Sequence, residues 1–308
     1  MKIFKLLCTA LLTVSLVACG GSKTNEIKTD GANTIDGYMN YEVLYAQVTD
    51  KIEPPILKGY YTYYKAKSTS NTLVDLVLKV ENTSAEEIKL ADLKGTFTVA
   101  DKDYQAIKVS EEDTSVSTSK GIASKETKNV HLYAEVDKKT DFTKDIKFVL
   151  EANETESELT FVVSNLEKKK DYQKSGYQLK DDKAEITIDK ITIKDQVNPE
   201  KPTGVYRYYK PTGSNNTFAA LKLSVKNIGT EDLAISKLIG SKAYIGNSTY
   251  PGQTVIQNEA KSSLYEAEQI KPGKTHTVYL LAQVPKADKD KDIEMSVYYA
   301  GTEIFVKK

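Results

Sequence analysis

The chain repeats itself over the length of a whole domain. Residues 59–65 read GYYTYYK and residues 204–210 read GVYRYYK, an offset of 145 (204 − 59). The same offset, without a gap between residues 59 and 103, aligns Leu76, Leu78, Val80, Asn82 and Gly95 with Leu221, Leu223, Val225, Asn227 and Gly240. Solenoid repeats are much shorter. The 308 residues are therefore predicted to contain two copies of one domain, each long enough to bury its own core.

Composition narrows the class of protein. Lys plus Arg and Asp plus Glu both number 43, so no net field favours nucleic acid, and we expect no nucleic-acid partner. The chain has 20 Tyr and 7 Phe on a background rich in Lys, Glu and Asp, which suits strands with one buried face and one wet face. The two cysteines, Cys8 and Cys19, precede the predicted domains, so no disulfide is expected to brace either core.

The first residues are typical of an export signal. Lys2 and Lys5 form a charged start, and residues 6–17 form an apolar run that is too short to span a bilayer comfortably. It ends in LVACG, which resembles the bacterial lipobox, where signal peptidase II cuts before the cysteine and a diacylglycerol is attached to its sulfur. We predict a lipoprotein signal peptide at residues 1–18 and lipid attachment at Cys19. The alternative is an ordinary signal peptide with a chance cysteine.

Two segments lack an apolar period. Residues 19–37 are rich in Gly, Ser, Thr, Asn and charge, and are predicted to form a flexible, lipidated tether. Residues 166–183 are charged and are predicted to form the linker between the domains. One hypothesis is that the large apolar residues of this linker, Tyr172, Tyr177 and Leu179, pack between the domains and limit their relative motion.

Alternating apolar residues predict an all-β fold. Val74, Leu76, Leu78 and Val80 alternate with outward positions that include Lys79, and Ser224 is the outward neighbour of Leu223 in the second copy. The phase changes between Val43 and Ala46, and again between Ile188 and Ile191, which predicts a β-bulge in both copies. Seven or eight short strands per copy indicate two tandem immunoglobulin-like β-sandwiches, at residues 38–165 and 184–308. The Cys…Trp…Cys core of antibody domains is missing, so the likeness is one of architecture.

Three features together resemble a known class of domain. They are the alternating strands that end at Asn82 and Asn227, the glycine-containing segments that follow, and the PGK at residues 272–274 before an apolar strand that ends in Val284-Pro285. The sequence is similar to exported lipoproteins of Gram-positive bacteria that carry uncharacterised immunoglobulin-like domains, and to a small secreted mycobacterial antigen of that fold. The first copy departs from the pattern with SKE at residues 124–126 and Asp137. The resemblance implies the fold and brings no catalytic residues.

No catalytic or metal-binding set stands out. His131 and His276 do not align under the repeat, and neither has a zinc-type spacing, so surface or strand positions are the favoured interpretation. The acidic runs at residues 111–113 and 288–292 lack the ligand spacing of a calcium loop. No nucleophile elbow or phosphate-binding loop is found. We therefore expect a protein that is not an enzyme and has no cofactor.

The tyrosine clusters rise above this background. The pair Tyr61/Tyr63 recurs as Tyr206/Tyr208, and the favoured interpretation is that the shared pair is structural and buried at a sandwich edge. The alternative is a tyrosine-rich surface that contacts a glycan or a protein, because tyrosine offers a large rigid contact area. Its best candidates are Tyr60, Tyr64 and Tyr209.

The sequence leads to two functional hypotheses. In the first, the protein is held by the lipid on Cys19 at the outer face of the bacterial cytoplasmic membrane and acts as a non-catalytic binding or adaptor module. Its partner would be an envelope protein or a cell-wall glycan. In the second, it is an accessory subunit or inhibitor of an envelope enzyme, transporter or sensor, because sandwich loops present protein-binding surfaces readily.

Overall fold

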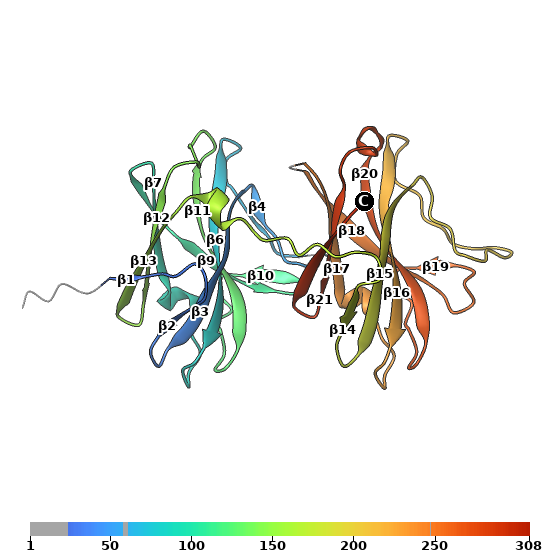
Figure 1. Cartoon of the computed structure of the whole chain (residues 1–308), viewed down its shortest axis with the longest axis horizontal. Helices are drawn as coiled ribbons and strands as arrows, with labels where there is room; N and C mark the ends of the chain where they lie inside the picture. Colours follow the sequence, from blue (N-terminus) through green and yellow to red (C-terminus); the bar gives the residue numbers. More distant parts are fainter. Residues whose placement is uncertain (1–23, 58–60, 247) are drawn as a thin grey trace, which may run out of the picture.

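The computed structural model describes residues 24–57, 61–246 and 248–308. These residues form two β-sandwiches that lie side by side and are joined by an extended linker (Figure 1). The prediction of an all-β chain with two tandem immunoglobulin-like sandwiches is confirmed. The predicted signal peptide and Cys19 lie outside the described residues. Among the described residues, no helix has the length and apolar character needed to cross a membrane.

The first sandwich pairs a five-stranded sheet with a six-stranded one. Their orders are β1-β13-β12-β7-β8 and β10-β9-β11-β6-β3-β2. The elements are β1 (Asn25–Glu26), β2 (Ala32–Ile35), β3 (Met39–Thr49), β4 (Lys51–Ile52), β5 (Tyr64–Lys65), β6 (Asn71–Asn82), η1 (Leu90–Asp92), β7 (Lys94–Val99), β8 (Lys102–Gln105), β9 (Ile107–Glu112), β10 (Ser115–Ser117), β11 (Thr127–Asp137), β12 (Ile146–Ala152), β13 (Thr155–Phe161) and η2 (Val163–Leu166).

The second sandwich repeats this topology. Strand β18 runs through both of its sheets and links them into one path, β14-β15-β16-β20-β18-β17-β21-β22, with β19 paired to β18. In the first sandwich the equivalent strand is interrupted at Ala106, between β8 and β9. The elements are β14 (Gln178–Lys180), β15 (Ala184–Lys194), β16 (Asn216–Asn227), η3 (Ile235–Lys237), β17 (Ile239–Ile245), β18 (Ser248–Gln257), β19 (Leu264–Tyr265), β20 (Thr275–Pro285), η4 (Lys286–Asp288), β21 (Glu294–Tyr299) and β22 (Thr302–Lys307).

The central strands carry the two main cores. Leu78 in β6 and Leu223 in β16 are fully buried, whereas their neighbours Lys79 and Ser224 are exposed, as the alternation predicts. Both predicted bulges are present. The pairing of β3 with β6 shifts between Val43 and Tyr45, and that of β15 with β16 shifts between Ile188 and Ile191. Each bulge adds one residue to β3 or β15. Beyond the bulge, the side chains of that strand that pointed inward at odd or even positions therefore change parity.

Each sandwich also has a small outer layer that the alternation does not predict. Leu73 and Val77 in β6, on the face opposite Leu78, are buried too. In the first sandwich, Leu73 packs with Ile52, Val109, Val116 and Tyr133. In the second, the outer cluster comprises Val197, Phe218, Ala220, Val255, Leu264 and Leu281. The segments after β3 and β15 therefore fold over the outer sheet face instead of leaving it wet.

The prediction of a flexible tether at residues 19–37 is wrong from residue 25 onward. Strand β1 pairs with β13, β2 forms a hairpin with β3, and Ile27 and Ile35 are buried in the first core. Two isolated isoleucines within a polar segment give no apolar period, yet each buries enough area to hold a short strand. The first sandwich therefore begins before residue 38.

The linker predicted at residues 166–183 is also too long, because its last part forms a strand of the second sandwich. Strand β14 pairs with β15, and Leu179 is buried in the second core, with Tyr177 packed against it. Tyr172 packs on Phe305 of β22, with ring centroids 6.1 Å apart, and donates to Glu294 at 2.6 Å. These residues do not pack between the domains as hypothesised; they attach the end of the linker to the second sandwich.

The alignment of Gly95 with Gly240 is also corrected. Gly95 pairs with Leu150 and faces inward, where a Cβ would lie 3.0 Å from Phe148. Gly240 faces outward, and a Cβ there would lie 2.7 Å from the carbonyl oxygen of Pro55 in the first sandwich. The second copy therefore gains a residue before β17, which turns this glycine toward the other sandwich. It allows a close approach between the two domains.

Candidate functional site

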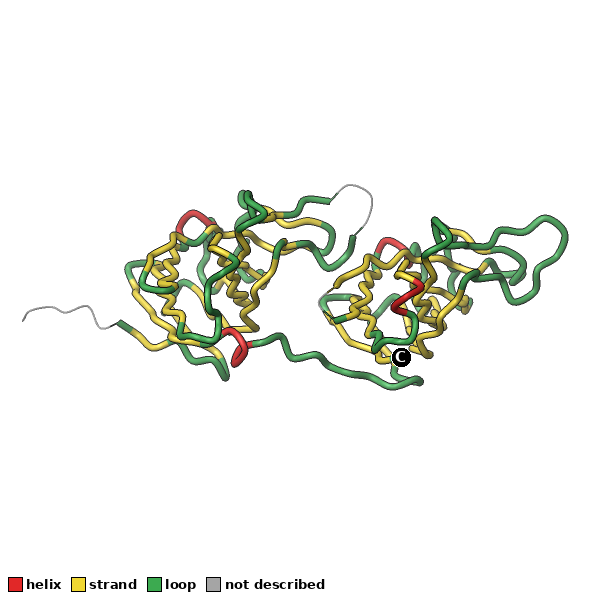
Figure 2. Tube along the Cα trace, turned by 90° about the horizontal axis from the view of Figure 1, so that it is seen from above, coloured by secondary structure: helices red, strands yellow, loops and turns green. Residues whose placement is uncertain are grey.

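The described tyrosines of both motifs lie on an arm of each sandwich and at its base. The first arm, described at residues 53–57 and 61–63, leaves the paired residues Ile52 and Tyr64. The second arm, residues 198–208, leaves the paired residues Val197 and Tyr209. The first arm reaches the second sandwich, whereas the second arm projects from the far side of the molecule (Figure 2).

The predicted burial of the shared pair is wrong in both copies, because no member of either pair is fully buried. Tyr63 and Tyr208 are both 46% exposed, and Tyr61 and Tyr206 are half-buried. The ring centroids of the pair are 5.9 Å apart in both arms. The arms extend beyond the sheets, so the sheets do not bury these rings. The two rings of each pair instead pack on each other within their arm.

The three candidate contact residues have different positions. Tyr60 lies outside the described residues. Tyr64 and Tyr209 are half-buried and pack against the outer clusters of their sandwiches. Tyr209 in addition lines an open pocket of about 550 Å³ on the second sandwich. The structure therefore brings one of the three predicted residues to a cavity.

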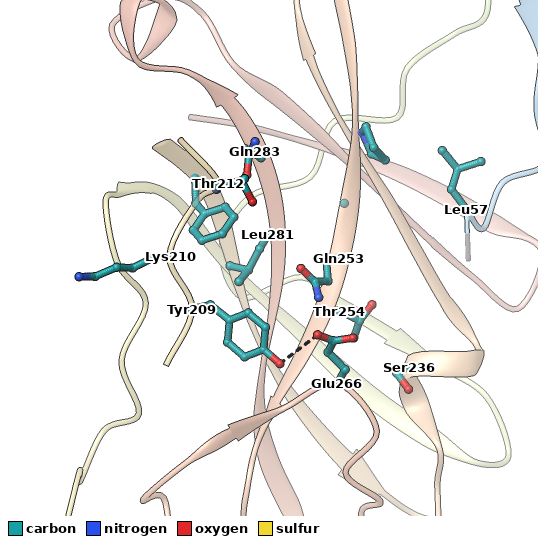
Figure 3. Close-up of a pocket in the computed structure, with 13 residues that line it drawn as sticks. Leu57, Tyr209, Lys210, Thr212, Ser236, Gln253, Thr254, Glu266, Leu281 and Gln283 are labelled. Carbon is teal, nitrogen blue, oxygen red and sulfur yellow. Dashed lines mark hydrogen bonds between the residues drawn. The ribbon is translucent and has the colours of Figure 1, made fainter. Parts of the chain in front are cut away.

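The floor of this pocket is apolar. It is formed by Phe218 of β16 and Leu281 of β20, which are both buried. The ring of Tyr209 lies near Leu281 (Figure 3). Phe218 and Leu281 belong to the outer cluster, on the face of the sheet opposite the main core. The floor is thus as rigid as the sheet that carries it. Leu57 of the first arm stands at one side of the opening.

The rim of the pocket is polar. Gln253 and Thr254 come from β18, Gln283 from β20, and Glu266 from the segment after β19. The Gln283 side-chain oxygen accepts from the Thr212 amide at 2.7 Å, which holds the Gln283 amide in place. Gln253 and Gln283 lie on the outer face, where their strand partners are Leu281 and Phe218. Thr254 pairs with Leu280 of the main core and lies on the opposite face of its strand.

Tyr209 and Glu266 are linked directly. The Tyr209 hydroxyl donates to Glu266 Oε1 at 3.2 Å. Burial and the neighbouring carboxylate together raise the pKa of Tyr209 to about 12, so the hydroxyl stays protonated at neutral pH. Lys210 also lines the pocket, but its ammonium lies 5.5 Å from the ring centre of Tyr208 and points away from the cavity.

Leu281 in place of Tyr133 is one of the substitutions that distinguish the outer faces of the two copies. Leu281 pairs with Ala220 in the second sandwich, and Tyr133 pairs with Asp75, the residue equivalent to Ala220, in the first. In the first sandwich, the rings of Tyr133 and Tyr64 lie 6.2 Å apart and occupy the outer face. Leucine is shorter than tyrosine, so less side chain fills the equivalent position beside Tyr209, whereas Phe218 in place of Leu73 adds volume on the same face. The repeat alignment of Tyr133 with Leu281 could have indicated this difference from the sequence.

His131 belongs to a buried charge cluster in the first sandwich. Its Nδ1 lies 2.8 Å from Asp75 Oδ2 and its Nε2 lies 3.4 Å from Glu111 Oε2. Gln47 and Asn129 donate to these two carboxylates at 2.8 Å. Burial alone would lower the pKa of His131, but Asp75 and Glu111 outweigh it and raise the pKa to about 10. The imidazolium is therefore held by two carboxylates as a structural ion cluster.

The two histidines do not meet. His276 lies in β20 of the second sandwich, where its Nδ1 is 2.8 Å from the Gln257 carbonyl oxygen. Both histidines lie on strands and are buried, which corrects the option of a surface position. Across the described parts of the chain, no group of three or more His, Cys, Asp or Glu side chains has the geometry of a metal site.

Comparisons with known proteins place the chain in a family. The structure is similar to an uncharacterised β-sandwich protein from Clostridium difficile 630, with 26% identity over 46% of this chain and 95% of that chain and a TM-score of 0.42. It is also similar to a conserved hypothetical protein from Bacillus anthracis, with 16% identity over 40% of this chain and 88% of that chain and a TM-score of 0.29. No curated protein matches the sequence. The family model described as "Domain of unknown function (DUF4352)" matches residues 150–304, which is just over half of the chain. The chain belongs to this DUF4352 family.

Proposed function

We propose that this protein is a non-catalytic binding module, anchored by a lipid on Cys19 at the outer face of the bacterial cytoplasmic membrane. The observation that carries the binding proposal is the pocket of the second sandwich. It combines a rigid apolar floor at Phe218 and Leu281 with a rim of amide, hydroxyl and carboxylate groups. Small-ligand sites commonly have this composition, and the pocket volume of about 550 Å³ falls in their range.

The non-catalytic part of the proposal is supported by the chemistry of the rim. Glu266 is paired with Tyr209, and the other rim groups that point inward are amides and hydroxyls. Activated nucleophiles need a base within hydrogen-bond reach and a third group that orients the base. Within residues 24–57, 61–246 and 248–308, the pocket brings no such trio together.

The lipid anchor is supported by the sequence LVACG at residues 16–20, behind a short apolar run. Replacing Cys19 by alanine is expected to leave an unlipidated precursor or to release the protein from membranes. The measurement is membrane fractionation with metabolic lipid labelling. If the variant stays with the membrane and the labelling is unchanged, the anchor is wrong.

The binding proposal is tested with a variant in which a larger side chain fills the pocket. Leu281→Tyr introduces the residue that the first sandwich already has at this position, so the fold is expected to tolerate it. Arrays of glycans and of small polar ligands should give at least one signal with the unaltered chain that Leu281→Tyr removes. Signals that are identical for both proteins would contradict binding in the pocket.

A second candidate function is that of an accessory subunit or inhibitor of an envelope protein. The observation that favours it is the second arm, where Val205 is fully exposed and Tyr208 is 46% exposed. Exposed tyrosine and arginine side chains are common anchors of protein interfaces, and Arg207 lies on the ring of Tyr265 at 5.1 Å. Co-purification from membranes with and without the double variant Val205→Ser/Tyr208→Ser tests this function. A stable partner that depends on the arm would favour it over the pocket.

A further inference from the structure

We infer that the pocket of the second sandwich takes an uncharged sugar unit of a glycan. This inference rests on the proposed binding function and names its ligand class.

The pocket has little net charge to offer a ligand. Its two charged side chains are Lys210 and Glu266. The Lys210 ammonium points out toward the ring of Tyr208, and Glu266 accepts the Tyr209 hydroxyl. A cationic site for a phosphate or carboxylate ligand would need inward-pointing arginine or lysine side chains. An anionic ligand would instead meet the Glu266 carboxylate, which disfavours it.

The rim offers both hydrogen-bond donors and hydrogen-bond acceptors. An amide side chain carries two N–H donors and one carbonyl acceptor. Gln253 and Gln283 supply such groups, and the Thr212 amide, at 2.7 Å, holds the Gln283 oxygen. Among the described residues, only Tyr209 hydrogen-bonds to Glu266, which leaves acceptor capacity on this carboxylate. Sugar hydroxyls donate and accept together, so such a mixed rim suits them better than it suits a purely basic or acidic ligand.

The floor suits the apolar face of a pyranose ring. A pyranose presents its C–H groups on one face and its hydroxyls around the edge. The ring of Tyr209 and the buried side chains of Phe218 and Leu281 form the apolar side of the pocket, and the polar groups stand around it. Aromatic rings provide large flat contact area at a small cost in conformational entropy. The two halves of the pocket thus match the two halves of the sugar.

The test uses the full-length chain in mild detergent and three tetrasaccharide probes in calorimetric titrations. Two probes are neutral, N-acetylated chitotetraose and cellotetraose, and one is acidic, tetragalacturonate. We expect at least one neutral probe to bind, at least threefold more tightly than the acidic probe. Salt screens interactions between charges, and binding of a neutral sugar does not depend on ion pairs. The affinity should therefore change less than twofold between 50 mM and 500 mM salt.

Three variants separate the roles of the pocket groups. Leu281→Tyr should weaken the neutral probe at least tenfold by filling the site. Gln253→Ala should weaken it roughly two- to tenfold, the effect of one lost neutral hydrogen bond. Glu266→Gln keeps an acceptor oxygen and should bind within about threefold of the unaltered chain, because exposed charges contribute little. Circular dichroism and thermal melting check that each variant is folded. If Leu281→Tyr does not fold, Gln253→Ala at the edge of the pocket replaces it as the test of binding in the pocket.

The outcomes are decisive for the ligand class. Tighter binding of the acidic probe, a steep salt dependence, or no binding of either neutral probe at millimolar concentration would overturn the inference. So would neutral binding that Leu281→Tyr and Gln253→Ala leave unchanged. In each of these cases the ligand arrays decide whether the proposed binding function also fails. The binding function stands if Leu281→Tyr removes some other array signal. If Leu281→Tyr removes no array signal, both the binding function and the sugar inference are wrong.

Discussion

Replacing Asn82 by alanine should destabilise the first sandwich by about 2–4 kcal/mol. Asn82 is fully buried at the end of β6, and its Nδ2 donates to the carbonyl oxygens of Glu86 at 2.7 Å and Ile122 at 2.8 Å. Its Oδ1 accepts from the Ser84 amide at 2.8 Å and the Ser84 hydroxyl at 2.7 Å. One side chain therefore ties three backbone segments together where the strand ends.

The magnitude follows from these four hydrogen bonds. A net contribution of about 0.5–1.5 kcal/mol each gives roughly 2–6 kcal/mol. The lower part of this range applies because both carbonyl acceptors keep another donor after the substitution. The Ile88 amide donates to Ile122 at 3.0 Å, and the Ser84 hydroxyl, once released from Asn82, can donate to the Glu86 carbonyl oxygen at 2.8 Å.

Calorimetry of the chain from residue 24 onward measures the effect, because it keeps every described residue of both sandwiches. We expect the melting of the first sandwich to fall by roughly 5–15 °C, as is usual for such a loss in a domain of this size. Asn227→Ala in the second sandwich removes three hydrogen bonds, at 2.7 Å, 2.7 Å and 2.9 Å, and should cost slightly less. Thr83→Ala, at an exposed neighbouring position, is the matched control. If Asn82→Ala and Thr83→Ala melt alike, the account of the strand end is refuted.

Three further predictions concern stability. Leu78→Ala should cost about 2–5 kcal/mol through lost burial and a cavity, whereas Lys79→Ala should cost well under about 1 kcal/mol; equal urea midpoints for the two would mean that the faces of β6 are wrongly assigned. Deleting residues 24–36 should cost roughly 3–6 kcal/mol, because it removes two buried isoleucines at about 1.5–3 kcal/mol each, and unchanged melting would restore the flexible tether. The raised pKa of His131 means that its stabilising contribution is complete below the ordinary pKa of 6.5 and is lost as the pH rises toward about 10. Melting of the first sandwich should therefore fall over this interval and do so less in His131→Gln, and parallel pH profiles would contradict this reading of the cluster.

The sequence was sufficient to predict the fold wherever apolar residues alternate over a long strand. The repeat, the buried faces of β6 and β16, and the bulges beyond Val43 and Ile188 could all be read from spacing. Short polar strands could not. Strand β2 holds only four residues, and its place depends on the hairpin with β3 and on a single buried isoleucine, Ile35.

The outer layer and the sites depend on pairings between distant residues. Asp75, Glu111 and His131 meet only because β11 lies between β6 and β9, and none of the three has a partner nearby in the sequence. The pocket depends on the sizes of outer-face side chains, Leu281 in place of Tyr133 among them, and on segments that fold back over the sheet. A strand pattern records which face is apolar but not what covers the opposite face.

Hydrogen–deuterium exchange of the full-length chain, with and without N-acetylated chitotetraose or cellotetraose, tests the central claim most directly. If the second sandwich holds a neutral sugar in its pocket, one of these probes should slow exchange in the segments at residues 207–212, 252–257 and 264–268. The equivalent segments of the first sandwich, at residues 62–67 and 106–112, should be unchanged. Protection confined to the first sandwich, or no protection by either probe at saturating concentration, would contradict the account.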